Sequence, residues 1–508
     1  MVRIKMREGT RGSQTGRCGR MAGRPAPGHF VGMRPLTLCV VLALAPAALA
    51  AQGRSLSAGD SALVGRILLA EERRDGADAA LTEGMAHHDS RVRSLAQRAH
   101  WRIGDSLFAA RDSLPALRPP RVWPDPEWRL RYRALAEQRT DCAALGAALA
   151  DSAWPVRLRA ADLVTPACAG DDRVAGTLER WVDDLPRRTE RRASGGVSWH
   201  AAAHGLLGLA RIRPDQSRRR TRDLARHRQW QVRVYAARAA ALLSDTATLR
   251  RLARDRDDNV KEAAIVGLSA LTRHDDDKLY VRALRSDGAQ AVRAAAIALK
   301  GTPSADAREA AGEVFTRWVE RANASARDAR LALLEAAGRP ASDDRPPAPR
   351  PELPPHAVAL ALGEEVRLRV EMAPSSGGGS FVVLLRGDAA PMMAARVLGL
   401  ATAGYYDGTS WHRVEHDFVI QGGGPGANEY VGHPVYFRDE LATVPHARGT
   451  VGMSTRGHDS GDGQWFINLR NNLRLGRDYT VFAEVAEGID VVDGILEGDV
   501  IASMRREP

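Results

Sequence analysis

The 508-residue sequence predicts a multidomain chain, in which an all-α region of helical repeats is followed by a smaller domain rich in β-strands. Three observations support this. The length exceeds what one hydrophobic core usually serves. Apolar residues recur at helical spacing from about Ser57 to Gly338. Strict apolar and polar alternation begins only after a proline-rich stretch at 340–355. The expected segments are an N-terminal extension at 1–50, helical repeats at 51–338, a linker at 339–357 and the β-rich domain at 358–508.

Residues 1–50 have the features of an export signal. A basic stretch ends at Arg34, an apolar run follows from Leu36 to Ala45, and small residues surround Leu49 before the expected cleavage after Ala50. The apolar run is too short for an ordinary transmembrane helix, and no later segment is apolar over about 18 residues. We expect release into a periplasm or to the cell exterior, without an integral membrane segment after cleavage.

The net charge does not indicate a nucleic-acid partner. The chain carries +11, but residues 1–50 hold eight Arg or Lys and one Glu, which is +7, so residues 51–508 carry +11 − 7 = +4. Acidic residues are dense among the remaining arginines, and no basic stripe that would follow a phosphate backbone stands out.

Two cysteines, Cys142 and Cys168, remain after the expected cleavage. They fall at the start of one predicted helix and just past the end of the next, and these two ends are neighbours in an antiparallel helix pair. An oxidising compartment would allow them to form a disulfide. The alternative is two separately buried thiols.

One pattern recurs through the helical region: a helix, a short turn with Asp or Ser, and a second helix that opens with Val-Arg or Val-Lys. The valines of this pattern are Val92, Val156, Val232, Val260 and Val292. The pattern resembles a HEAT-like repeat array, in which hairpins stack because a lone hairpin cannot cover its apolar face. Such an array would offer a surface to a protein partner. The alternative is an unrelated Ala-rich helical bundle.

The proline-rich stretch separates the two kinds of pattern. Residues 340–355 hold seven prolines and predict a semi-extended linker. Alternation over Glu365–Glu371 predicts a half-buried strand, and Ser380–Leu385 predicts a second strand that completes a hairpin. A helix is expected near Pro391–Thr402, with further short strands to the C-terminus.

Four motifs carry the chemical information: GYYDGTSWHRV at 404–414, DFVIQGGGPG at 417–426, GTVGMST at 449–455 and GQWFINL at 463–469. Together they resemble the cyclophilin family over roughly residues 364–500. The resemblance implies a closed β-barrel with flanking helices and peptidyl-prolyl cis-trans isomerase activity on proline-containing polypeptides.

Rotation about an X-Pro bond must break amide resonance, a barrier of about 18 to 20 kcal/mol. A catalyst needs an apolar pocket for the proline ring and a fixed donor that stabilises the twisted amide, but no nucleophile, metal or cofactor. We expect no cofactor and no metal site, since no HExxH motif is present. The stretch HDSGDG at 458–463 does not indicate a serine protease, because adjacent residues cannot form a triad.

The resemblance also implies roles for individual residues. Arg413 would be the donor to the prolyl amide, and Gln421 would orient it. The expected walls of the proline pocket are Phe418, Val419, Phe466 and Leu475, with Met453 beneath. The expected contacts with the peptide are Ser454, Thr455, Gln464 and Tyr479.

The sequence departs from the family pattern around this site. Val419 replaces a usual methionine, Glu415 replaces an apolar residue, Ser454-Thr455 replaces Ala-Asn or Ala-Arg, and Arg474 replaces a rim tryptophan. Two functions therefore stay open. One is an exported isomerase that assists protein folding, and the other is a catalytically weak scaffold that binds proline-containing peptides.

Overall fold

The computed structural model describes residues 56–185, 199–320, 326–345 and 351–508. The expected export signal at 1–50 lies outside the described residues. By their contacts, residues Leu56–Pro508 form one unit.

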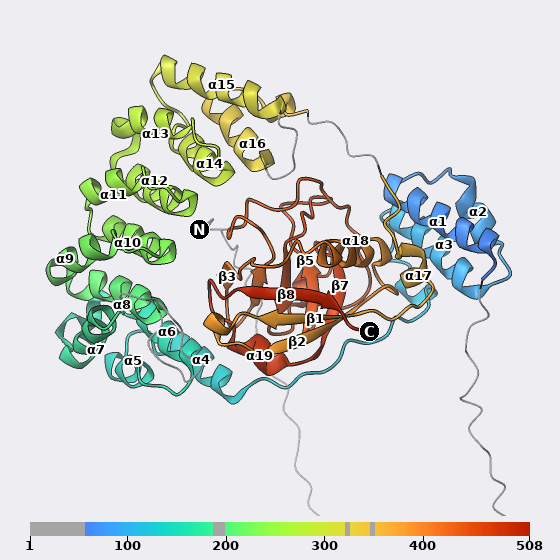
Figure 1. Cartoon of the computed structure of the whole chain (residues 1–508), viewed down its shortest axis with the longest axis horizontal. Helices are drawn as coiled ribbons and strands as arrows, with labels where there is room; N and C mark the ends of the chain where they lie inside the picture. The colour runs from blue at the N-terminus through green and yellow to red at the C-terminus, as the bar shows by residue number, and fades with distance from the viewer. Residues whose placement is uncertain (1–55, 186–198, 321–325, 346–350) are drawn as a thin grey trace, which may run out of the picture. The chain divides into compact units, whose positions relative to one another are not determined.

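The first part of the described chain is helical, as predicted (Figure 1). Its helices are α1 (Ala58–Arg73), α2 (Ala79–Met85), α3 (Ser90–Ile103), α4 (Glu127–Glu137), α5 (Cys142–Ala148), α6 (Trp154–Leu163), α7 (Asp172–Asp183), α8 (Trp199–Ile212), α9 (Pro214–Leu224), α10 (Trp230–Leu242), α11 (Thr246–Leu252), α12 (Asp258–Thr272), α13 (Asp277–Ala283), α14 (Ala289–Ala298), α15 (Ala305–Glu320) and α16 (Arg327–Ala336).

Aspartates precede several of these helices. The carboxylates of Asp141, Asp171, Asp245 and Asp257 each accept a hydrogen bond from a backbone N–H two or three residues further on. They satisfy donors that have no partner inside the helix. The five valines of the pattern are at most 1 % exposed, so they face the interior of the protein.

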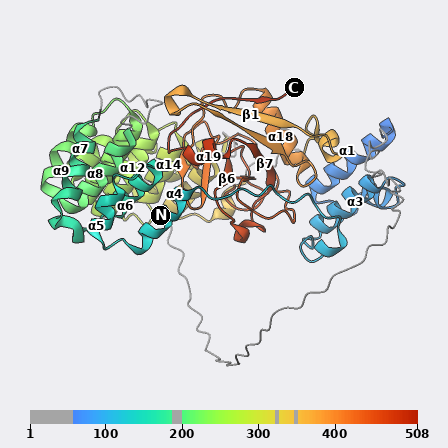
Figure 2. The ribbon, with the colours of Figure 1, turned by 90° about the horizontal axis from the view of Figure 1, so that it is seen from below.

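Helices α4 to α16, which we call the array, share one hydrophobic core. Helices α8, α10, α12, α14 and α16 contact one another in that order. They follow one another side by side in Figure 1, and Figure 2 shows α8, α12 and α14 in the same order. Cys142 and Cys168 form a disulfide that joins the start of α5 to the turn before α7. That the hairpins are of HEAT type stays a prediction.

Helices α1 to α3 belong to a different core. Val64, Ile67 and Val92 lie in the same buried cluster as Leu360 and Met393 of the C-terminal domain. These helices therefore pack on the β-rich domain, although α3 opens with the same Val-Arg pattern as the helices of the array. The predicted domain boundaries themselves stay predictions.

The C-terminal domain contains α17 (Ala357–Ala361), β1 (Arg367–Met372), β2 (Ser380–Leu385), α18 (Pro391–Thr402), β3 (Arg413–Val414), β4 (Val419–Gly422), β5 (Thr450–Met453), β6 (Trp465–Asn468), β7 (Val481–Glu487), α19 (Ile489–Gly494) and β8 (Ile501–Arg506). The alternation predicted for β1 is confirmed, because Leu368, Val370 and Met372 are buried while the residues between them are partly exposed. The β1–β2 hairpin and helix α18 are confirmed as well.

The strands form one antiparallel sheet in the order β3-β4-β6-β5-β7-β2-β1-β8. The sheet curls into a half-barrel, and residues just before β3 bond to the start of β8. Gly408 N–H donates to Ile501 O (2.8 Å), and Trp411 N–H donates to Asp499 O (2.9 Å). The fold class predicted from the sequence, a helical region followed by a cyclophilin-like β-domain, is confirmed.

Helices of the array contact the C-terminal domain one after another. These contacts run from α4 to α16 and are Arg129 with Asp493 (2.7 Å), His200 with Glu497 O (2.6 Å), Tyr235 with Glu497 (2.7 Å), Asn259 with Gly426 O (3.1 Å), Arg293 over the Tyr430 ring (3.9 Å) and Asp328 with Arg456 (2.5 Å). The array face that carries these residues is thus covered by the chain's own β-domain. Any separate protein partner of the array would have to use another of its surfaces.

Within the ranges that the structure describes, no helix has both the length and the apolar character needed to cross a membrane.

Candidate active site

Three neighbouring strands bring the motif residues into one row. Arg413 on β3 pairs with Gln421 on β4, and Gln421 pairs with Phe466 on β6. Residues directly opposite each other in antiparallel strands project from the same face of the sheet. The donor, its expected orienting residue and the aromatic wall therefore lie side by side on one face.

This face holds a cavity of about 180 Å³. Its lining residues are Arg413, Phe418, Val419, Gln421, Glu429, Ser454, Thr455, Arg456, Phe466, Leu475 and Tyr479. The cavity is smaller than the roughly 300 to 1,000 Å³ of sites that enclose a drug-sized ligand. It therefore suits one small side chain better than a whole organic ligand.

The floor of the cavity is apolar. Val419, Phe466 and Leu475 form a buried cluster of their own, with Phe418 and Tyr479 packed at its edge. Burial of apolar surface of this kind contributes roughly 25 cal/mol per Å². A proline ring that enters the cavity would gain the same contribution from each square ångström it buries.

Phe466 is held in place from several sides. A Cβ atom at Gly452 on β5 would stand 2.4 Å from the Phe466 ring, so the glycine leaves the space that the ring occupies. The His446 ring stacks on Phe466 with centroids 5.8 Å apart, and the Tyr479 ring meets it edge-on at 5.6 Å. Burial lowers the pKa of His446 to about 4, so this imidazole is neutral at pH 7.

Arg413 stands at the rim of the cavity with a side chain that is 37 % exposed. Its Nε–H donates to Glu415 Oε1 (2.9 Å), and its Nη1–H donates to Gln421 Oε1 (3.4 Å). A second carboxylate, that of Glu429, lies 3.6 Å from Nε. Gln421 in turn donates from Nε2 to Ser454 Oγ (2.9 Å), so hydrogen bonds connect Ser454 through Gln421 to the guanidinium.

The structure brings nine of the eleven residues expected at the site to the cavity: Arg413, Phe418, Val419, Gln421, Ser454, Thr455, Phe466, Leu475 and Tyr479.

Met453 and Gln464 do not line the cavity. Side chains alternate along a strand, and Gly452 faces Phe466, so Met453 points the other way into the barrel core, where it is fully buried. Gln464 is also fully buried. It donates to Val431 O (3.1 Å) and accepts from Gln421 Nε2 (3.4 Å), so it supports Gln421 from behind.

Two cavity residues, Glu429 and Arg456, were not expected from the sequence. Both lie in connecting segments outside the strands, where no alternation or recognisable spacing marks them. Their chemistry is ionic. Arg456 donates from Nη1 to the backbone carbonyl of Glu429 and from Nη2 to Asp462 (2.7 Å). One wall of the cavity is therefore charged.

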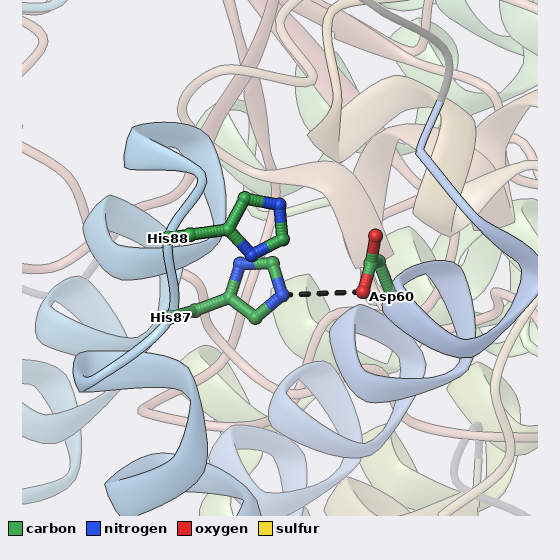
Figure 3. A group of neighbouring side chains, drawn as sticks. All are labelled: Asp60, His87 and His88. Atoms are coloured by element: carbon green, nitrogen blue, oxygen red, sulfur yellow. Dashed lines mark hydrogen bonds and ion pairs between the residues drawn. The ribbon is translucent and has the colours of Figure 1, made fainter.

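A group that could hold a metal ion lies elsewhere among the described residues, at Asp60, His87 and His88 (Figure 3). His87 Nδ1 accepts from the Asp89 N–H (3.1 Å), so in neutral His87 the proton is on Nε2, which lies 3.2 Å from Asp60 Oδ1. A nitrogen that donates has no lone pair for a metal. Asp60 also accepts from Ser57 in the capping box of α1. The contact between Asp60 and His87 therefore connects the start of α1 to the turn between α2 and α3.

Comparison with known proteins matches the C-terminal part of the chain to a known family. The family described as "Cyclophilin type peptidyl-prolyl cis-trans isomerase/CLD" matches residues 369–507. A peptidyl-prolyl cis-trans isomerase of Helicobacter pylori is 36% identical over 119 residues, which is 23% of this chain and 73% of that protein. Peptidyl-prolyl cis-trans isomerase B of Bacillus subtilis is 34% identical over 122 residues, 24% of this chain and 85% of that protein. A solved cyclophilin-type isomerase of Cryptosporidium parvum is 21% identical, with a TM-score of 0.27, and covers 28% of this chain and 99% of its own.

Proposed function

Because the chain belongs to the cyclophilin-type peptidyl-prolyl cis-trans isomerase family, we propose that its C-terminal domain isomerises X-Pro bonds with Arg413 as the donor. One observation carries the proposal. A single cavity combines an apolar floor of Val419, Phe466 and Leu475 with a guanidinium at its rim. These are the two features that rotation of a prolyl amide requires.

The chemistry follows from the geometry. The proline ring enters the apolar floor, which fixes one end of the amide. As the C–N bond twists, resonance is lost and the lone pair returns to the prolyl nitrogen, which becomes a hydrogen-bond acceptor. An N–H of Arg413 then donates to that nitrogen more strongly than to the planar amide, which lowers the barrier. No covalent bond breaks and no proton is transferred.

Gln421 prepares this step. It accepts from Arg413 and is itself held by Ser454, so its amide cannot turn freely. A guanidinium that is already oriented loses less entropy when the substrate arrives. The carboxylates of Glu415 and Glu429 keep the guanidinium near the rim but also compete for its N–H groups.

This competition favours a second candidate function. If Glu415 holds the guanidinium too firmly, the domain would bind proline-containing peptides in the same cavity with little turnover. The pair is largely solvent-exposed, with side chains 37 % and 50 % exposed, and exposed pairs are worth only about 0 to 1 kcal/mol. The isomerase is therefore the function that the geometry supports best.

We further propose that the chain is exported and assists the folding of proline-containing clients. The basic and apolar segments of residues 1–50 support export, and so does the disulfide between Cys142 and Cys168, because such bonds persist in oxidising compartments. Mass determination of the protein recovered from a cell envelope or culture supernatant tests this. A mature chain that starts at Ala51 is expected, and a cytoplasmic chain that retains residues 1–50 would contradict it.

The isomerase is tested with a short Ala-Pro peptide and an Arg413→Ala variant. Loss of a donor aimed at developing charge costs about 10²- to 10³-fold in turnover, and peptide binding in the apolar floor should persist. Arg506→Ala is the matched control, because Arg506 is a similarly exposed arginine of the same domain that pairs with Glu364 (2.9 Å) and does not line the cavity. Equal, near-background turnover for the native and Arg413→Ala proteins, with peptide binding intact, would establish the binding scaffold instead.

A further inference from the structure

We infer that the helical array completes the isomerase site, with Asp328 on α16 and Asn259 on α12 as positioning residues that hold the charged wall of the proline cavity. The inference rests on the proposed function. It concerns Glu429 and Arg456, the two cavity residues that were not expected from the sequence.

Arg456 is held from both domains. Its side chain is 16 % exposed and has three anionic or carbonyl partners. Two belong to the β-domain, the Asp462 carboxylate and the Glu429 carbonyl. The third is the carboxylate of Asp328, whose Oδ2 lies 2.5 Å from Arg456 Nε. The position of this cavity-lining guanidinium is therefore set partly by the first turn of α16.

The segment that presents Glu429 is held on both sides of that residue. Asn259 donates from Nδ2 to Gly426 O (3.1 Å) and accepts from Asn428 Nδ2 (3.0 Å). This one side chain of the array therefore binds the segment at two points just before Glu429. On the other side, the Arg293 guanidinium of α14 lies 3.9 Å from the Tyr430 ring centroid. Asn428 and Tyr430 thus both contact the array, and Glu429 between them lines the cavity.

The electrostatics agree with this arrangement. Burial alone would lower the pKa of Arg456, but the carboxylates of Asp462 and Asp328 more than offset that effect and raise it, so the cation is retained. The array also places Glu262 3.5 Å from Arg293, behind the segment that carries Glu429. Two charged side chains of the array, Asp328 and Arg293, therefore contact the parts of the β-domain that form the charged wall.

Other contacts between the array and the β-domain provide an internal control. Tyr235 on α10 donates to Glu497 Oε2 (2.7 Å), and neither residue lines the cavity. If the array only stabilised the β-domain, loss of this contact would matter as much as loss of the contacts from α12 and α16. If the array positions the wall, only the latter should change substrate handling.

The experiment compares full-length Asp328→Asn, Asn259→Ala and Tyr235→Phe proteins on an Ala-Pro peptide, with kcat and KM measured separately. For the first two variants we expect KM to rise about fivefold with kcat changed less than about twofold, as for loss of a binding wall rather than of the donor. Tyr235→Phe should leave both constants unchanged. In an Arg456→Gln background, Asp328→Asn should add less than about twofold, because residues that act through one another are not additive.

Two results would overturn the inference. One is that Asp328→Asn and Asn259→Ala shift KM no more than Tyr235→Phe does, and the other is that Asp328→Asn keeps its full effect without Arg456. If Asp328→Asn does not fold, Asn259→Ala, which removes only neutral hydrogen bonds, decides alone. Arg413→Ala is run alongside. If Arg413→Ala loses activity while the array variants have no effect, only this inference is refuted. If Arg413→Ala keeps its activity, the proposed function itself is refuted.

Discussion

Substitution of Glu415 by glutamine is expected to make the isomerase faster. In the free site, Arg413 Nε–H donates to Glu415 Oε1 at 2.9 Å, and a second N–H of the same guanidinium donates to the same oxygen. A prolyl amide must draw at least one of these donors away. A neutral glutamine still accepts a hydrogen bond but attracts the cation less, so the donor is released more readily.

The magnitude follows from the exposure of the pair. With side chains 37 % and 50 % exposed, water screens the attraction, and pairs of this kind contribute about 0 to 1 kcal/mol. One kcal/mol corresponds to about fivefold in rate, so kcat/KM of Glu415→Gln should rise by up to about fivefold. Added salt should speed the native protein towards the variant, because it screens the same pair.

The assay is exchange between the cis and trans forms of a short Ala-Pro peptide, followed by NMR at low and high ionic strength. Glu487→Gln is the matched control, because Glu487 is an exposed glutamate that pairs with Arg367 in the same domain but does not line the cavity. A tenfold loss of kcat/KM in Glu415→Gln would refute the reasoning. It would mean that the carboxylate orients Arg413 for catalysis and does not compete for it.

Three other predictions concern the floor, the array and the disulfide. Phe466→Ala should lose peptide binding by calorimetry and cost about 3 to 5 kcal/mol of unfolding free energy, because a buried aromatic ring is removed. Burial raises the pKa of Glu262 to about 7, so the folded state binds its proton more tightly than the unfolded state does. The stability of the native protein should therefore fall as pH rises from about 4.5 to 7. Glu262→Gln should depend less on pH in urea unfolding and be more stable than the native protein at pH 8, by at most about 3 kcal/mol. Cys142→Ser should lower the stability of the array by about 2 to 4 kcal/mol in thermal unfolding, and reductant should have no further effect on that variant.

Local patterns predicted most of the elements. Alternation around Val370 and the apolar run that starts at Pro391 each depend on residues close in sequence, and the structure forms β1 and α18 there. The core of α1 to α3 could not be predicted in this way. Val92 and Val232 open their helices with the same pattern, but one packs with the β-domain and the other with the array. The choice depends on partners hundreds of residues away, which periodicity does not report.

The candidate site was also predicted in part. Arg413, Gln421 and Phe466 lie in strand motifs, where a fixed register turns sequence spacing into a spatial row. Met453 was expected beneath the pocket, but the alternation of β5 gives that place to Gly452 and turns Met453 inward. A motif alone does not state which of two adjacent residues faces the cavity.

The array changes what the cavity can respond to. The isomerase of Bacillus subtilis is matched over 85% of its length, so little of that protein lies outside the matched region. In this chain, however, the Gly426 carbonyl and the Asn428 amide find partners on α12, and Arg456 finds one on α16. Without those helices, Arg456 and the segment that carries Glu429 would each lose an anchor, and the charged wall of the cavity would lose its single arrangement. A ligand that bound the outer surface of the array and shifted α12 against α16 would move this wall. It would therefore alter KM without entering the proline cavity.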